Sequence, residues 1–186
     1  MTDYAESLAA PFRDARARLA ALADGHPSDA FNRKPSDQGW SAGECVVHLN
    51  KMAKAYLPVL EEAARLDGPR DAPPFRYGWV GRKFVDAVRP GARPISTMRA
   101  MKPPPSADAG RSDVDVDRAL ARFEADVDRY LAVVADSDGL DLARIKVRSP
   151  FLPILRLPLG IFLEAMGQHS VRHVLQAERA LAARPG

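Results

Sequence analysis

Two histidines stand four residues apart near the end of the chain, in the segment GQHSVRHVLQAERAL, residues 167–181. On an α-helix, residues at this spacing project from the same face, so His169 and His173 would point in the same direction. Imidazole is a common ligand of zinc, nickel, copper and iron, and the spacing lets two rings converge on one ion. The pair therefore suggests a metal site. The simpler alternative is a pair of core histidines with separate hydrogen-bond partners.

A third histidine falls at an inward position on a different predicted helix. His48 lies between Cys45 and Met52 in a stripe of apolar residues that recur every three or four positions. The remaining histidine, His26, stands between a glycine and a proline, which is typical of an exposed loop. Three of the four histidines are thus expected to face one interior. A ring from a facing helix would complete a three-histidine metal site.

Amphipathic helices would have to position these histidines. Such helices are recognised by a stripe of apolar residues at three- and four-residue intervals, the period of a helix with one buried face. The second helix has the clearest beginning, because Ser41 and Glu44 stand three residues apart, as in a capping box. The third is expected to begin at Ser112, with acidic residues in its first turns. Four segments show the stripe: residues 2–24, 41–67, 112–138 and 159–182.

The connections between these segments differ greatly in length. Residues 69–110 form a long, proline-containing crossover, with one short helix expected over residues 80–88. Residues 149–160 are apolar but interrupted by prolines, which favours a loop packed on the helices. No segment alternates apolar and polar residues as a half-buried strand does. We therefore predict an all-α protein, a single domain over residues 1–186, built as a four-helix bundle with a long crossover between helices 2 and 3.

The composition argues against several classes of protein. Hydrophobic residues make up 46% of the 186 residues, and the formal net charge is only +3. No run of basic residues concentrates positive charge, so no nucleic-acid partner is expected. No apolar run approaches the roughly 20 residues that span a bilayer, so no membrane partner is expected either. The single cysteine cannot form an intrachain disulfide and no secretory signal is recognisable, so we predict a cytoplasmic location.

Together these motifs resemble those of the DinB-like superfamily of metal-binding four-helix bundles. The matching segments are WSAGECVVHL, residues 40–49, and GQHSVRHVLQAE, residues 167–178. The family pattern is a Trp-Ser helix start, a histidine seven residues after the serine, and a late HxxxH motif followed closely by glutamine. The corresponding residues here are Trp40, Ser41, His48, His169, His173 and Gln176. The resemblance covers nearly the whole chain in order and spacing.

The resemblance implies a divalent metal ion held by His48, His169 and His173. Nickel or zinc is typical of the family, and iron occurs in some members. Characterised relatives include thiol-dependent transferases and isomerases that use a low-molecular-weight thiol such as bacillithiol or mycothiol, and many members are homodimers. The expected partners are therefore a small-molecule substrate, a low-molecular-weight thiol, and a second copy of the chain. No thiol-binding residue is identifiable in the sequence.

Three neutral imidazoles would leave a divalent ion its full charge and open coordination positions, which is typical of a catalytic site. Such an ion could lower the pKa of a water or a thiol, and so support transfer or hydrolysis. The prediction is a metal-dependent thiol S-transferase or hydrolase. Two alternatives stay open. One is a metal-stabilised bundle without catalysis, acting as a dimeric binding or stress-response module, and the other is a bundle without metal.

Several neighbours of the histidines allow two interpretations each. Glu44 could lie near the metal, although its position favours capping the helix. Cys45 could be a fourth ligand or a reactive thiol, although a small buried apolar residue is the commoner case. Gln176 could contact a metal ligand or simply provide polar packing. The aromatic residues of the crossover could wall a substrate pocket or pack on the bundle: Tyr77, Trp79 and Phe84.

Overall fold

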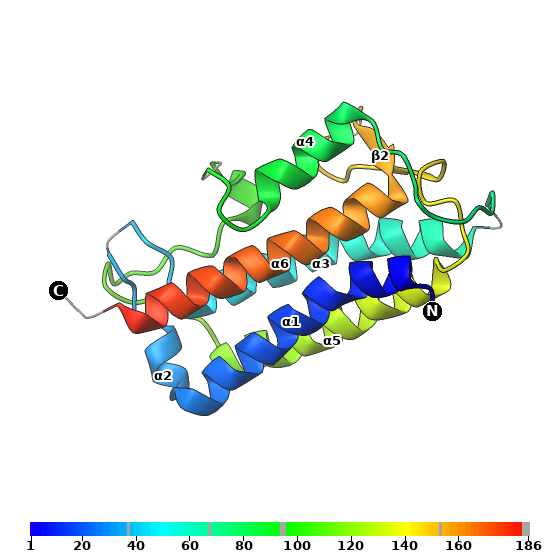
Figure 1. The fold of residues 1–186 in the computed structure, drawn as a ribbon. Coiled ribbons are helices and arrows are strands. Elements are labelled where there is room, and N and C mark those ends of the chain that lie inside the picture. The colour runs from blue at the N-terminus through cyan, green and yellow to red at the C-terminus, as the bar shows by residue number, and fades with distance from the viewer. Residues whose placement is uncertain (37, 67, 94–95, 153, 184–186) are drawn as a thin grey trace.

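Four long helices form the body of the protein in a computed structural model that describes residues 1–36, 38–66, 68–93, 96–152 and 154–183. In Figure 1, α1 lies beside α5 and α6, and α3 lies on the opposite side in contact with the same two helices. The prediction of an all-α four-helix bundle is confirmed. The long helices are α1 (Asp3–Gly25), α3 (Ala42–Arg65), α5 (Val116–Asp136) and α6 (Leu159–Ala182).

The beginning of α3 is set by the predicted capping box. The Ser41 hydroxyl accepts a hydrogen bond from the Glu44 amide at 3.1 Å, and the Glu44 carboxylate accepts one from the Ser41 amide at 2.8 Å. These bonds satisfy two backbone donors that a helix end would otherwise leave without partners. At its other end α3 stops at Arg65, slightly before the predicted boundary at Asp67, which lies outside the described residues.

The prediction that the third long helix begins at Ser112 is wrong. α5 begins four residues later, with Asp115 as its N-cap, and the Asp115 carboxylate accepts from the Arg118 amide at 3.2 Å. The Ser112 hydroxyl instead lies 2.7 Å from the Asn32 side-chain oxygen and 2.7 Å from the Ser41 hydroxyl. Either residue type can cap a helix. Contacts with distant parts of the chain therefore decided which of them does so.

The crossover between α3 and α5 contains the predicted short helix, α4 (Trp79–Val88), and a 3₁₀ turn, η1 (Arg99–Met101). α4 lies along the outer side of α6 (Figure 1). Gly81 permits this close approach, because a Cβ atom there would lie 2.9 Å from a side-chain carbon of Ile161. A four-residue helix, α2 (Ser28–Phe31), joins α1 to α3 and was not predicted, since it is too short to show a helical period.

The expectation of a strand-free chain needs correction. A small antiparallel sheet, β1 (Lys146–Arg148) with β2 (Arg156–Pro158), precedes α6. Val147 pairs with Leu157 in this sheet, and both side chains are buried in the core. Each strand has only three residues, which is too few for the alternation of apolar and polar residues to be distinguished from a loop.

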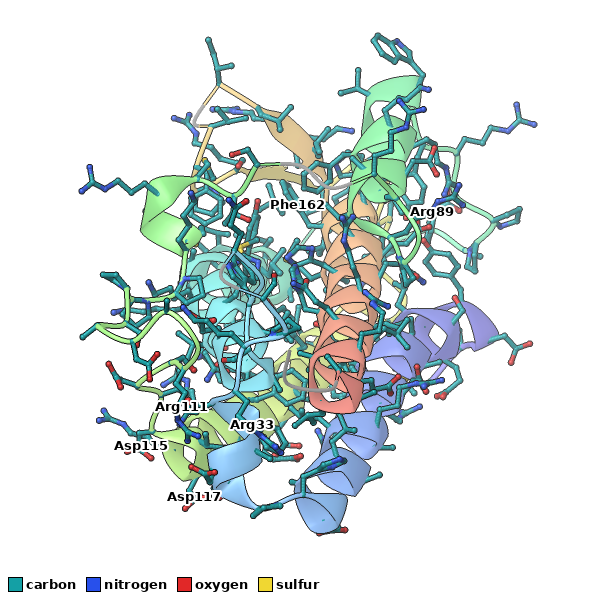
Figure 2. All side chains as sticks on the ribbon, turned by 90° about the vertical axis from the view of Figure 1, so that its left-hand side faces the viewer. Arg33, Arg89, Arg111, Asp115, Asp117 and Phe162 are labelled. Carbon is teal, nitrogen blue, oxygen red and sulfur yellow. The ribbon has the colours of Figure 1, made fainter. Side chains whose placement is uncertain are left out.

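The core lies between the four long helices. Phe162 of α6 is fully buried there, whereas charged side chains such as Arg89 and Asp117 lie at the exposed rim (Figure 2). Phe12 of α1 stacks on Tyr130 of α5 with ring centroids 4.6 Å apart, which ties two neighbouring helices together. Among the described residues, no helix is both long enough and apolar enough to span a bilayer.

Candidate metal centre

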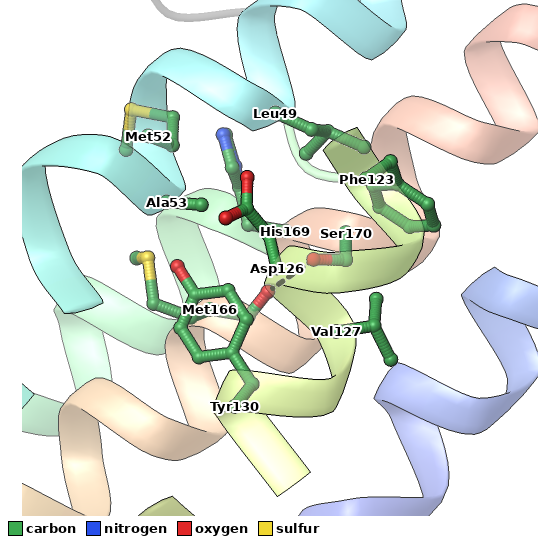
Figure 3. Close-up of a pocket in the computed structure, with 10 residues that line it drawn as sticks. All are labelled: Leu49, Met52, Ala53, Phe123, Asp126, Val127, Tyr130, Met166, His169 and Ser170. Atoms are coloured by element: carbon green, nitrogen blue, oxygen red, sulfur yellow. Dashed lines mark hydrogen bonds between the residues drawn. The ribbon is translucent and has the colours of Figure 1, made fainter. Parts of the chain in front are cut away.

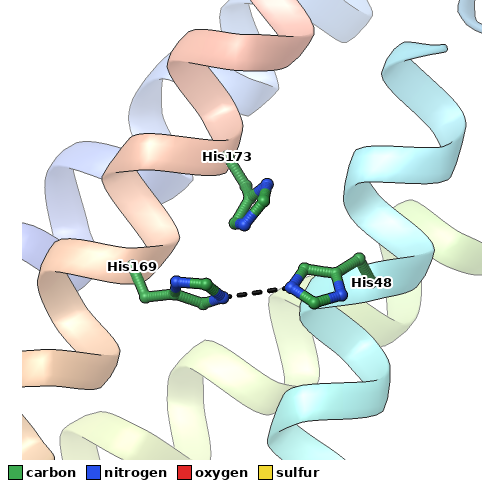
Figure 4. A group of neighbouring side chains, drawn as sticks. All are labelled: His48, His169 and His173. Carbon is green, nitrogen blue, oxygen red and sulfur yellow. Dashed lines mark hydrogen bonds between the residues drawn. The ribbon is translucent and has the colours of Figure 1, made fainter. Parts of the chain in front are cut away.

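The structure brings the three predicted histidines together inside the bundle. His48 comes from α3, and His169 and His173 come from successive turns of α6 (Figure 4). One candidate ligand nitrogen from each ring can be chosen so that all three lie within 4.8 Å of one another. The Nε2 atoms of His48 and His169 are 3.1 Å apart. Two nitrogens at about 2 Å from one ion in tetrahedral geometry are separated by a similar distance.

The crossover fixes the orientation of the His48 ring. Its Nδ1 atom lies 2.8 Å from the main-chain carbonyl oxygen of Met101, in η1. A carbonyl only accepts hydrogen bonds, so Nδ1 carries the proton and Nε2 keeps its lone pair. That lone pair faces His169. A metal-binding histidine is usually held in the right tautomer by such a hydrogen bond, made by the ring nitrogen that does not bind the metal.

All three rings are neutral at ordinary pH. Burial lowers the pKa of His169 to about 3, with smaller contributions from His48 and Arg172. Burial also lowers the pKa of His173 well below its usual range, and that of His48 to a smaller degree. An imidazole must be unprotonated to bind a metal. The site therefore offers ligands at neutral pH without first having to lose protons.

Two ring nitrogens at the site lack partners. Within the described part of the chain, the buried Nδ1 atoms of His169 and His173 form no hydrogen bond. Three separately satisfied core histidines would each have partners for both nitrogens, so this alternative fits the structure poorly. Three neutral imidazoles from two helices, with one ring already oriented by a carbonyl, do fit the donor set of a divalent metal ion.

An aromatic wall and the crossover enclose the site. The Trp40 ring lies 5.8 Å from that of His173 in a stacked arrangement and 5.1 Å from that of His48. Arg172 of α6 donates to three carbonyl oxygens of the crossover, those of Ala87, Arg89 and Arg93, at 3.1–3.5 Å. These hydrogen bonds hold residues 87–93 of the crossover against α6, next to His173.

Glu44 and Cys45 are explained without a metal. The Glu44 carboxylate is committed to the capping box and also lies 3.6 Å from the Lys34 ammonium group. Cys45 is buried, and burial raises the pKa of its thiol far above the neutral range, so it is not a thiolate. The group of potential ligands at this site comprises the three histidines and does not include Cys45. The interpretations as a helix cap and as a small buried residue therefore hold.

Gln176 lies close enough to His173 to affect it. The principal effect on the pKa of His173 is the lowering caused by burial, and contact with the Gln176 side chain acts in the opposite direction. Nevertheless, Nδ1 of His173 has no hydrogen bond of normal geometry within the described residues. Gln176 is thus a neighbour of the site and not an established partner of the ring.

Of the three aromatic residues considered in the crossover, two pack away from the histidines and the third is exposed. The Tyr77 hydroxyl lies 2.6 Å from that of Tyr4, and the Phe84 ring meets Phe162 edge to face. Trp79 is 77% exposed at the start of α4. The packing alternative is therefore correct for Tyr77 and Phe84. Trp40 does border the histidines, although its place directly before the helix cap had indicated only a helix start.

Sequence reasoning missed two contributions to the site. The Met101 carbonyl could not be found from residue types, because any residue there would supply the same oxygen. Asp126 and Tyr130 lie on the buried face of α5 and line a cavity with His169. A usable signal did exist, since Asp126 falls three residues after Phe123, at an inward helical position where an acid is unusual.

Comparison with known protein families gave a match over most of the chain. A protein-family model described as the DinB superfamily matches residues 12–177. This match includes all three histidines and most of each long helix. A search of curated proteins gave no match, and neither did a search of solved structures.

Proposed function

The chain belongs to the DinB superfamily, and on that premise we propose that it is a metal-dependent enzyme whose ion is held by His48, His169 and His173. The observation that carries the proposal is the approach of three neutral ring nitrogens to within 4.8 Å of one another. Two of the rings lie 121 residues apart in the chain. Nickel or zinc is the expected ion, with iron as a further candidate, since all three accept imidazole ligands.

The residues around the rings would prepare the site for chemistry. Neutral imidazoles add no charge, so a bound divalent ion keeps its full Lewis acidity and can lower the pKa of a thiol or a water molecule. The Met101 carbonyl orients His48 by accepting its Nδ1 proton. The Trp40 ring lies against the rings of His48 and His173 and shields them from bulk water. Taken over the whole residue, His169 is partly exposed whereas His48 and His173 are buried, so we place substrate entry on the His169 side.

The proposed reaction is thiol transfer or hydrolysis of an electrophilic small molecule. A thiol deprotonated at neutral pH is a strong nucleophile, and Cys45 does not supply one because its thiol is buried and protonated. The cosubstrate would then be a low-molecular-weight thiol that enters from solvent. A water molecule would occupy the same role in hydrolysis.

One observation favours a second candidate, a metal-stabilised bundle without catalysis. His48 is 3% exposed and His173 is 7% exposed, which leaves a substrate little direct access to either ring. A closed metal site would stabilise the fold by joining α3 to α6, since metal-binding free energy adds to folding free energy. Such a protein would act as a dimeric binding or stress-response module.

Elemental analysis of the untagged protein tests the metal. We expect close to one equivalent of nickel, zinc or iron in the wild-type protein and in His26→Ala, whose side chain lies outside the site. His169→Ala should retain far less. Equal metal content in wild-type protein and His169→Ala would refute the proposed site.

Turnover separates the two candidates. The metal-loaded protein is incubated with a small thiol and an electrophilic aromatic halide, and the conjugate is measured with and without a chelator. An enzyme should form conjugate only when metal is present, and His169→Ala should lose the rate. If no thiol gives metal-dependent conjugate and no hydrolysis is found, while metal still raises the melting temperature, the non-catalytic candidate is correct.

A further inference from the structure

A small buried cavity of about 10 Å³ lies beside His169, between α3, α5 and α6 (Figure 3). That volume is about what one water molecule needs, provided that two to four polar groups surround it. Four residues that line the cavity carry side-chain nitrogen or oxygen atoms: Asp126, Tyr130, His169 and Ser170. The other lining residues are apolar, so these four determine what the cavity can bind.

Asp126 is an acid in an apolar position. It is 2% exposed on the inner face of α5, between Phe123 and Tyr130. The Arg122 guanidinium donates from Nε to both carboxylate oxygens at 3.0 Å, and Arg129 lies 3.7 Å away. A carboxylate has about four acceptor positions, so these contacts leave capacity on the side that faces the cavity.

The other polar groups of the cavity differ in how far they are satisfied. The Ser170 hydroxyl donates to the Met166 carbonyl at 2.9 Å. Tyr130 is buried and its side chain carries a hydroxyl that can donate and accept. The buried Nδ1 of His169 has no hydrogen bond in the segments that the structure describes. The cavity is therefore lined by a carboxylate that can accept, a hydroxyl that can do both, and a ring nitrogen that needs a partner.

The partner of Nε2 of His169 decides which of the two ring nitrogens carries the proton. Because Nε2 of His48 is unprotonated, its 3.1 Å contact with Nε2 of His169 requires a proton on His169 when no metal is present. A metal ion bound at that Nε2 requires the proton to be on Nδ1 instead. The Nδ1–H group then needs an acceptor in a buried place, and the cavity with Asp126 lies next to the ring.

Resting on the metal site proposed above, we propose that one water molecule in this cavity accepts the Nδ1–H of His169 and donates to the Asp126 carboxylate. Asp126 is then a positioning residue. It selects the His169 tautomer whose Nε2 lone pair faces the ion, and the Tyr130 hydroxyl gives the water a third partner. Outer-shell carboxylates that hold a histidine in this way raise metal affinity by 10- to 100-fold, according to measurements on other metal sites.

The experiment measures zinc affinity in the full-length protein by competition with a chromogenic chelator. Asp126→Leu removes the acceptor, and we expect the dissociation constant to rise about 10- to 100-fold. Asp126→Asn keeps an acceptor oxygen, so its loss should be only a few-fold. Arg122→Gln is the matched control, because it removes the closer of the two arginine partners of Asp126 and leaves the carboxylate beside the cavity. Its dissociation constant should stay near that of the wild type.

A second measurement follows the ring directly. Proton–nitrogen NMR of the zinc-loaded wild-type protein should show a His169 Nδ1–H signal that exchanges slowly with solvent. The signal should persist in Asp126→Asn and broaden or vanish in Asp126→Leu. Because the bound ion already places the proton on Nδ1, this readout reports whether that N–H group has an acceptor, which a purely structural role of Asp126 would not change.

The outcomes separate the inference from the function on which it rests. If folded Asp126→Leu binds zinc as tightly as the wild type, the inference is wrong and the metal site stands. If Asp126→Leu does not fold, rapid exchange of the His169 Nδ1–H in the zinc-loaded wild type is enough to overturn the inference. If the wild type binds neither zinc nor nickel, the proposed function fails first, and the inference falls with it.

Discussion

Acid should destabilise the metal-free protein through its buried histidines. Burial lowers the pKa of His169 to about 3 in the folded state, whereas the exposed ring in the unfolded chain has the ordinary value of 6.5. Between these values the unfolded state binds a proton that the folded state does not. The free energy of unfolding is therefore intact above about pH 6.5 and decreases as the pH falls toward about 3.

The size of the effect follows from the same two values. Each unit of pKa difference corresponds to about 1.4 kcal/mol. At pH 5, about 1.5 units below the ordinary pKa, protonation of His169 in the unfolded state removes about 2 kcal/mol of stability relative to pH 7.5. Burial lowers the pKa of His173 and His48 as well, so these rings add to the loss in the same direction.

Urea unfolding at pH 7.5 and pH 5, with a chelator present, measures this loss. In His169→Leu the difference between the two pH values should be smaller than in the wild type by about 2 kcal/mol. His26→Gln is the control and should match the wild type, because His26 lies at the end of α1, away from the site. If His169→Leu keeps the full wild-type difference, His169 is not a buried neutral ring and the reasoning is refuted.

Three further substitutions test other parts of the structure. Gly160→Ala places a Cβ atom against the Tyr77 hydroxyl, and thermal unfolding should show a loss of about 1–3 kcal/mol. Ser41→Ala removes the cap of α3, and urea unfolding should show a loss of about 1–2 kcal/mol; an unchanged midpoint would contradict the cap. Arg172→Gln should speed hydrogen exchange over residues 87–93 and leave the amides of the bundle unchanged; equal protection in that segment would show that Arg172 does not hold it.

Local signals predicted the long helices well. The apolar stripes and end signals placed α1 and α6 within a residue or two of their bounds, and the capping box placed the start of α3. Helix period and capping depend on residues a few positions apart, so the sequence carries them directly. α2 and the β1–β2 pair were missed because elements of three or four residues have no readable period.

The start of α5 shows where local reasoning fails. Both Ser112 and Asp115 have suitable side chains, and nothing within a few residues distinguishes them. The choice was made by Asn32 and Ser41, which bond Ser112 from other parts of the fold. For Asp126 the helical period did indicate an inward position, but its place beside His169 depends on packing between α3, α5 and α6.

The sequence by itself determined that His169 and His173 face the same way, because four residues make slightly more than one helical turn. It also placed His48 on the buried face of its helix. Only the tertiary structure decided that His48 meets the other two rings, since that depends on how α3 packs against α6. Only the tertiary structure, too, supplied the Met101 carbonyl, which lies 53 residues beyond His48 and acts through a main-chain atom that every residue possesses.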